Sequence, residues 1–268
     1  MDLTTLALAF FIGLLGGVLS GMFGMGGATI KIPLMHLLLG MNAHAVIGTA
    51  LPLTIPAALT GAIVYRKNKL LKYKTILVCG IAGAAASVIG AMFTEYFSSM
   101  ALMAMLGVLL IFLAYITPKQ GWIEREAWVF SDKEKLARTV FIGIVAGMCA
   151  GFFGIGGGIV LVPLLMRLRR IPYREAVASS LAIMVIYSVP AAATHFALGN
   201  VNMPILGAMF LGAIWGAWFG ANKVVSAKGT DMKNRLAALL AILGIILILY
   251  EGLLFYRVLL PPGTSSCI

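Results

Sequence analysis

Residues 17–36 read GVLSGMFGMGGATIKIPLMH, and residues 147–166 read GMCAGFFGIGGGIVLVPLLM. The two stretches align without a gap at an offset of 130 residues, and 8 of the 20 positions are identical. A second match follows at an offset of 134, where PAALT at 56–60 corresponds to PAAAT at 190–194. An internal duplication of this kind predicts two structurally similar halves.

The composition around this duplication places the chain in a lipid bilayer. Hydrophobic residues make up 61% of the 268 residues, charged residues make up 11%, and the mean hydropathy is +1.03. Soluble domains are ~45–50% apolar and ~25% charged, because an aqueous surface must be solvated. The composition therefore excludes a soluble enzyme, a nucleic-acid-binding protein, a disordered chain and a secreted disulfide scaffold. It predicts an all-α polytopic membrane protein.

Ten apolar segments are expected to form the helices. Two of them, 28–40 and 158–168, are too short to cross the membrane, for which ~17–25 residues are needed. Each follows a glycine-rich break and must be helical, because backbone polar groups in lipid need partners within the protein. We therefore expect a broken helical hairpin in each half. The other eight segments are 3–23, 44–65, 75–94, 99–117, 139–153, 175–198, 204–222 and 235–256.

The basic residues indicate how the two halves are oriented. Of the 20 Lys and Arg residues, 18 fall in the four clusters 66–74, 119–138, 167–174 and 223–235. Short basic loops stay on the cytoplasmic side of a membrane. Each basic loop within a half corresponds to a loop without Lys or Arg in the other half, so equivalent loops would face opposite sides. The pattern predicts an inverted-topology repeat of five plus five segments, with both termini outside.

This organisation divides the chain into four parts. They are a first inverted repeat at 1–118, a cytoplasmic connector at 119–138, a second inverted repeat at 139–258 and a C-terminal tail at 259–268. No basic region precedes the first apolar segment, so we expect that segment to stay in the mature protein. We expect no catalytic residue, metal site or cofactor, since no H-E-x-x-H motif, G-x-S-x-G motif or paired carboxylate occurs.

The two glycine-rich breaks are the candidate substrate site. Each precedes a short helix whose N-terminus carries free N–H groups and about +0.5 of an elementary charge. Glycine allows a positive φ and a close approach of the backbone to a ligand. Two such loops that meet near the membrane midplane would bind a small oxyanion, although dense glycines can also serve helix packing alone. The glycines concerned are Gly24, Gly26, Gly27, Gly154, Gly156, Gly157 and Gly158.

Several polar side chains lie at membrane depth and could complete this site. Lys31, about one turn past Gly27, would supply a fixed positive charge and link anion binding to proton binding. The hydroxyls could donate to the substrate or bond to their own backbone. His195 could handle a proton or be a buried histidine with one satisfied nitrogen. The candidates are Lys31, Thr49, Ser179, Ser180, Thr194 and His195.

The duplicated G-x-F-G-x-G-G motif, followed by a short apolar stretch and Pro, resembles the sulfite exporter TauE/SafE family. That family is also called the 4-toluene sulfonate uptake permeases. The resemblance extends to AVIGT at 45–49, AVASS at 176–180 and the Thr194-His195 pair ahead of Gly199. It implies transport of sulfite, organosulfonates such as sulfoacetate, or related small sulfur anions. Lys31 departs from the family pattern, which has an aliphatic residue there.

Together these features predict a secondary transporter that exports a small sulfur-containing anion by alternating access. Its expected location is a prokaryotic plasma (inner) membrane, which it crosses several times. The alternatives are transport of another small organic anion or of a metal ion, although the 15 methionines are scattered and suit ordinary packing. The expected partners are the anionic substrate, the lipid bilayer and a coupling proton, without nucleic acid. The sequence leaves the oligomeric state open.

Overall fold

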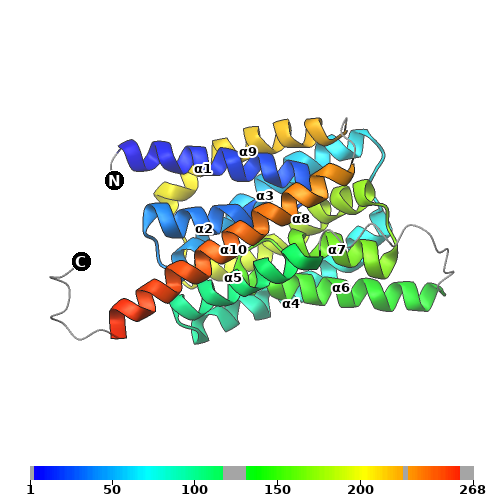
Figure 1. The fold of residues 1–268 in the computed structure, drawn as a ribbon. Coiled ribbons are helices and arrows are strands. Elements are labelled where there is room, and N and C mark those ends of the chain that lie inside the picture. The colour runs from blue at the N-terminus through cyan, green and yellow to red at the C-terminus, as the bar shows by residue number, and fades with distance from the viewer. Residues whose placement is uncertain (1–2, 117–130, 226–228, 260–268) are drawn as a thin grey trace.

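The computed structural model describes residues 3–116, 131–225 and 229–259. Most of the predicted connector 119–138 and of the predicted tail 259–268 lies outside these residues. The described chain forms ten α-helices and one short 3-10 helix (Figure 1). In chain order these are α1 (Leu3–Phe23), α2 (Ala28–Leu39), α3 (Ala43–Lys67), α4 (Tyr73–Phe93), η1 (Thr94–Tyr96), α5 (Ser99–Ile116), α6 (Asp132–Phe153), α7 (Gly158–Arg169), α8 (Tyr173–Ala197), α9 (Met203–Val225) and α10 (Gly229–Leu259).

The predicted all-α membrane fold is confirmed. Eight helices in the described part of the chain are long and apolar enough to cross a membrane, whereas α2 and α7 have only 12 residues each. Helix α6 begins seven residues before the predicted start at 139, because Ser131 and Glu134 form a capping box. This polar turn continues the helix beyond its apolar part.

The two halves pack on each other through matching pairs of helices. Helix α1 lies along α9 as α6 lies along α4, and α3 contacts α9 as α8 contacts α4. The central pair, α3 and α8, and the pair α5 and α10 each join corresponding helices of the two halves. Exchange of the halves therefore maps these contacts onto one another. The opposite orientation of the halves in a membrane stays a prediction.

Glycines allow α1 and α6 to approach their neighbours closely. A Cβ atom at Gly17 would collide with the carbonyl oxygen of Ala213 in α9, and one at Gly147 would collide with that of Gly83 in α4. The collisions involve backbone atoms, which cannot move aside as a flexible side chain does. These two glycines therefore serve helix packing.

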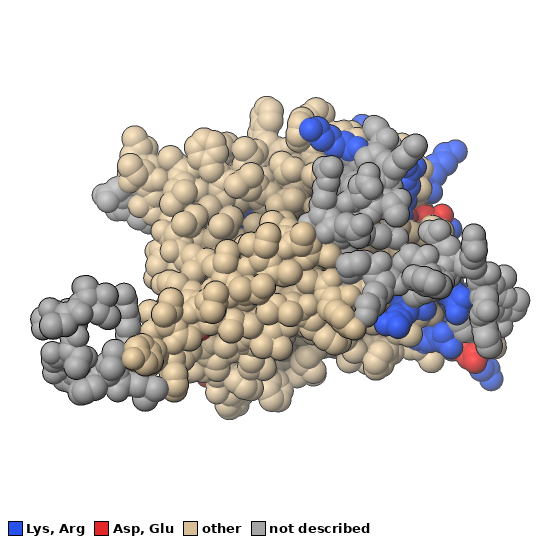
Figure 2. All heavy atoms as spheres, in the orientation of Figure 1, with Lys and Arg blue, Asp and Glu red and all other residues tan. Residues whose placement is uncertain are grey.

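The two ends of the bundle differ in their charged residues. Lys and Arg side chains gather at one end, over the loops 68–72 and 170–172, which we call the basic end (Figures 1 and 2). The loops 40–42 and 198–202, the start of α1 and the end of α10 lie at the opposite end, which we call the far end (Figure 1). The assignment of the basic end to the cytoplasm stays a prediction.

Candidate functional site

The two glycine-rich loops, 24–27 and 154–157, lie against each other inside the protein. A Cβ atom at Gly158 would collide with the carbonyl oxygen of Gly24 and would come within 2.8 Å of Met25 Cα. All residues of both loops are buried. The structure thus brings together two segments that are 130 residues apart in the sequence.

Thr54 of α3 and Met184 of α8 contact both loops. A Cβ atom at Gly26 would come within 2.6 Å of Thr54 Cγ2 and would collide with Met184 Cε. A Cβ atom at Gly156 would lie 2.7 Å from Thr54 Cγ2 and 3.1 Å from Met184 Cε. Each of the two residues is the twelfth in a helix of 25 residues, so the loops meet halfway along α3 and α8. Met184 was not predicted, although the offset of 130 makes it equivalent to Thr54.

The loop backbone adopts a conformation that favours glycine. The φ angles of Gly24, Gly26 and Gly27 are 68°, 71° and 68°, and their three counterparts at 154, 156 and 157 have φ angles of 67°, 68° and 61°. Gly27 and Gly157 are the N-cap residues of α2 and α7, and neither helix has a side-chain cap. The N–H groups of both first turns therefore lack a capping side chain where the loops meet. Two positive helix ends converge there.

Lys31 is fully buried beside this meeting point. Its Nζ lies 3.5 Å from the carbonyl oxygen of Leu53, the residue before Thr54. Its alkyl chain fills the space next to Gly16, where a Cβ atom would come within 2.5 Å of Lys31 Cγ. The second half has Ala146 and Leu161 at the equivalent positions. Gly16 therefore makes room for a lysine that the second half lacks.

The charge on Lys31 has no carboxylate partner among the described residues. The three ion pairs found there involve other residues. In its protonated form Lys31 adds a positive charge next to two helix N-termini, and the site is then strongly positive because the low dielectric of the interior weakens screening. Such a site is suited to hold an anion.

Buried hydroxyls lie close to the loops, and they differ in their hydrogen bonding. Ser180 Oγ lies 3.0 Å from the Gly24 carbonyl oxygen, and the Tyr187 hydroxyl donates to the Gly156 carbonyl oxygen at 2.6 Å. Ser20 Oγ and Thr29 Oγ1 have no hydrogen-bond partner among the described residues. The sequence did not predict Ser20, Thr29 or Tyr187 as site residues, because hydroxyls with and without a partner look the same in a sequence.

Three predicted hydroxyls lie elsewhere and bond to the backbone. Thr49 Oγ1 accepts a hydrogen bond from the N–H of Asn202 at 2.9 Å, and Ser179 Oγ accepts one from the N–H of Lys72 at 3.2 Å. Thr194 Oγ1 donates to the carbonyl oxygen of Pro190 at 2.9 Å. Only the Thr194 bond is the bond to its own helix that the sequence left open, whereas Thr49 and Ser179 accept from backbone groups of distant segments. The structure does not bring the three hydroxyls to the glycine loops.

His195 is buried near the site but outside the contact between the loops. Its Nε2 lies 3.0 Å from the carbonyl oxygen of Gly151 in α6, three residues before the loop that begins at Gly154. Because a carbonyl oxygen only accepts hydrogen bonds, Nε2 carries the proton in this contact. Nδ1 has no partner in the described part of the chain.

A separate pocket of about 370 Å³ opens at the basic end. It lies between the starts of α4 and α6 and the end of α7. Its lining includes four cationic residues and one acidic residue, namely Lys74, Lys133, Lys135, Arg169 and Asp132. The pocket is electropositive and lies at the basic end of the bundle, whereas the glycine loops meet halfway along α3 and α8.

Comparisons with known proteins show what the chain is similar to. The sequence profile of the family described as Sulfite exporter TauE/SafE matches residues 9–249. The chain is 27% identical over 270 residues to "Probable membrane transporter protein YunE" of Bacillus subtilis (strain 168), covering 90% of this chain and 96% of the relative. It is 25% identical over 265 residues to a "Probable membrane transporter protein" of Methanocaldococcus jannaschii, covering 92% and 97%. No solved structure matches the chain.

Proposed function

Because the chain belongs to the sulfite exporter TauE/SafE family, a family of membrane transporters, we propose that it transports small sulfur-containing anions such as sulfite or organosulfonates. The mechanism would be secondary transport by alternating access of the two halves around the paired glycine loops. The substrate class is drawn from the family and from the charge of the candidate site. No enzymatic activity is proposed.

The observation that carries the proposal is the buried lysine at two helix N-termini. Lys31 and the first turns of α2 and α7 present positive charge and N–H donors, while Ser20 and Thr29 add two hydroxyls without a partner among the described residues. Sulfite and sulfonate groups carry three oxygen acceptors on one sulfur, so several donors can bind one group. Such donors are already oriented before the anion arrives, which favours binding.

The basic end supports export from the cytoplasm of a prokaryotic cell across its plasma membrane. By the positive-inside rule this end faces the cytoplasm, and its pocket would raise the local concentration of anions there. The burial of both glycine loops matches a state in which the site is closed to both sides. Alternating access would open it first toward one end and then toward the other.

Transport of a metal ion is the less favoured alternative. A cation at the loops would face the Lys31 ammonium and two positive helix ends, and like charges repel strongly in a low dielectric. Another small organic anion, such as a carboxylate, satisfies the same electrostatics and is an outcome of the test below.

Ligand-dependent thermal stability of the detergent-solubilised protein tests the proposal. A ligand that binds only the folded state raises the melting temperature as its concentration exceeds its Kd. We expect stabilisation by sulfite or sulfoacetate, and none by divalent metals or neutral sugars. Stabilisation by acetate but not by sulfur anions would show that the site binds carboxylates instead. Stabilisation by metals alone would refute the anion site.

Two lysine variants make this test specific to the site. Lys31→Met removes the buried charge and should weaken anion binding at least tenfold, because a charged hydrogen bond contributes about 1.5–3 kcal/mol. Lys67→Met removes an exposed charge from the last turn of α3 and serves as the matched control. Equal anion affinity in both variants would show that Lys31 does not bind the substrate.

A further inference from the structure

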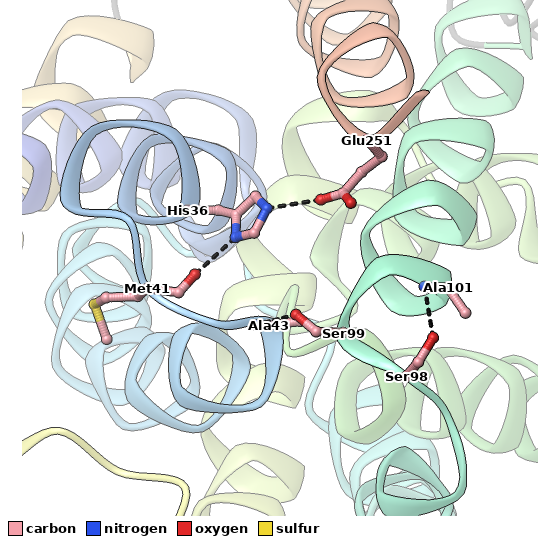
Figure 3. Close-up of polar contacts among 7 residues, drawn as sticks. All are labelled: His36, Met41, Ala43, Ser98, Ser99, Ala101 and Glu251. Carbon is pink, nitrogen blue, oxygen red and sulfur yellow. Dashed lines mark hydrogen bonds and ion pairs between the residues drawn. The ribbon is translucent and has the colours of Figure 1, made fainter. Parts of the chain in front are cut away.

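A buried histidine and a buried glutamate join α2 to α10 near the far end. His36 Nε2 lies 2.7 Å from Glu251 Oε1, and His36 Nδ1 lies 2.7 Å from the carbonyl oxygen of Met41 (Figure 3). The two side chains are only 10% and 5% exposed. The pair connects residues 215 positions apart and lies away from the glycine loops.

The two contacts of His36 require two hydrogens. The Met41 carbonyl oxygen only accepts, and so does an ionised carboxylate, whereas a neutral imidazole carries a single N–H. With a neutral His36 and an ionised Glu251, one of the two 2.7 Å contacts would therefore join two acceptors. The observed geometry needs one additional proton, either on His36 as imidazolium or on Glu251 as the acid. In both cases the pair holds that proton between Nε2 and Oε1.

We propose that His36 and Glu251 form a proton-binding site that fastens the end of α2 to α10 while the proton is bound. Loss of the proton leaves two acceptors facing each other, so one of the two contacts must open. The proton would enter from the solvent at the far end, because Gly40 and Asn42, on either side of Met41, are exposed. The ligand of this site is thus a proton.

The position of α2 gives this site a consequence for the candidate anion site. Helix α2 has Gly27 as its N-cap and Lys31 in its first turns, while His36 lies near its C-terminal end. The N–H of Ala43 donates to Ser99 Oγ at 2.8 Å, which fixes the start of α3 to α5 (Figure 3). Release of His36 would therefore loosen the C-terminal end of α2 while the start of α3 stays in place. The consequence for transport rests on the proposed function, whereas the proton site itself does not.

Few other titratable groups face the pair. The Tyr250 ring of α10 meets the His36 imidazole edge to face, with 5.6 Å between the ring centroids. Helix α1 has no titratable side chain, and α5 has only Tyr115, near its other end. His44 of α3 and Glu95 of η1 lie at the same end but have other partners, the Thr94 carbonyl oxygen and the Asn200 amide. A proton that is gained or lost at this place is therefore gained or lost by His36 or Glu251.

Nitrogen-15 NMR of histidine-labelled full-length protein in nanodiscs tests the proton site directly. The chain has three histidines, so His44→Gln and His195→Gln variants assign the signals. We expect His36 Nδ1 to carry a proton throughout the pH range in which α2 is fastened. We also expect the pH dependence of the His36 signals to change in Glu251→Gln, because this variant removes the carboxylate that faces Nε2. Glu95→Gln, at an exposed carboxylate, is the matched control. An unchanged His36 titration in Glu251→Gln would overturn the proposal.

A distance measurement without substrate tests the fastening. Spin labels at Leu38 of α2 and Leu253 of α10, which are 54% and 64% exposed, report their separation by electron paramagnetic resonance. In a background without native cysteines, we expect the distance to change with pH in otherwise native protein but not in Glu251→Gln. A pair at Leu77 and Phe141, on α4 and α6, should stay constant. A pH-independent distance in the native background would refute the fastening, whatever the substrate proves to be.

Discussion

Tyr65 and His195 hold the same place in the two halves and bond to equivalent carbonyl groups. The Tyr65 hydroxyl donates to the Gly21 carbonyl oxygen at 3.1 Å, and His195 Nε2 lies 3.0 Å from the Gly151 carbonyl oxygen. Tyr65 and His195 are 130 residues apart in the sequence, and so are Gly21 and Gly151. A tyrosine and a histidine thus make the same connection, from α3 to α1 and from α8 to α6. The shared contact requires only a donor.

We predict that His195 acts as a structural donor. His195→Ala leaves the buried Gly151 carbonyl unpaired, which should lower the free energy of unfolding by about 1–3 kcal/mol. His195→Gln offers an N–H donor and should lose less stability. Thermal unfolding and the pH profile of transport measure both effects. A changed pH profile in a fully stable His195→Gln protein would show that the histidine handles protons.

We predict that small side chains at the loop glycines impair transport. Gly26→Ala combines a positive φ with a Cβ that collides with Met184 and meets Thr54. The left-handed conformation alone costs a non-glycine residue about 1–2 kcal/mol. We therefore expect a folded but less stable protein with strongly reduced transport of the preferred anion, measured in proteoliposomes.

Gly199→Ala separates backbone strain from crowding. Gly199 has a φ of 74°, and no atom lies within 4 Å of its added Cβ. Its substitution should cost similar stability and leave transport unchanged at saturating substrate. If Gly26→Ala and Gly199→Ala transport equally well, the glycine loops serve packing rather than binding.

We predict that Gly16 and Lys31 are energetically coupled. Gly16→Ala places a methyl group where the lysine chain runs, so it should displace Lys31 and weaken anion binding. Combined with Lys31→Leu, it recreates the Ala146 and Leu161 combination of the second half. The double variant should be more stable than the sum of the two single effects predicts. Strict additivity in a double-mutant cycle would contradict the coupling.

We predict that Thr49 and Ser179 stabilise the protein without contacting the substrate. Thr49→Val leaves the N–H of Asn202 without its acceptor, and Ser179→Ala does the same to the N–H of Lys72. Each loss should reduce the free energy of unfolding by about 1–2 kcal/mol. The KM of transport should stay within twofold of the native value. A large increase in KM with unchanged stability would show that these hydroxyls contact the substrate.

We predict that the basic end faces the cytoplasm. In a background without native cysteines, Tyr96→Cys at the far end should react with a membrane-impermeant thiol reagent added to intact cells. Asn68→Cys at the basic end should react only after the membrane is opened. Tyr96 is 83% exposed, and Asn68 is also exposed, so both positions are accessible to a reagent on their own side. The reverse labelling pattern would reject the predicted topology.

The sequence predicted the helices and the breaks because these features depend on local properties. Apolar segments of sufficient length form helices in lipid, and a glycine cluster interrupts them wherever positive φ angles are needed. The short helices α2 and α7 were found for this reason. Lys31 was recognised as a candidate because a lysine among apolar residues stands out in any sequence.

Other parts of the site depend on contacts between distant segments. In the sequence Met184 looks like an ordinary apolar residue, and only the position of α8 in the structure shows that it contacts Gly26 and Gly156. Thr49 and Ser179 read as candidate donors until the loops beyond α8 and α3 bring N–H groups to them. A hydroxyl in a helix can bond to several partners, and only the packing selects one.

By itself the sequence determined that this chain is a duplicated, helical membrane protein with two glycine breaks and a lysine beside one of them. Composition, the length of apolar segments and internal similarity are properties of the sequence alone and do not depend on contacts between distant segments. The tertiary structure alone decided that the two breaks touch, that Gly16 accommodates Lys31 and that His36 meets Glu251 across 215 residues. These relationships arise from the crossing of helices, whose positions depend on the packing of the whole bundle and not on any local stretch.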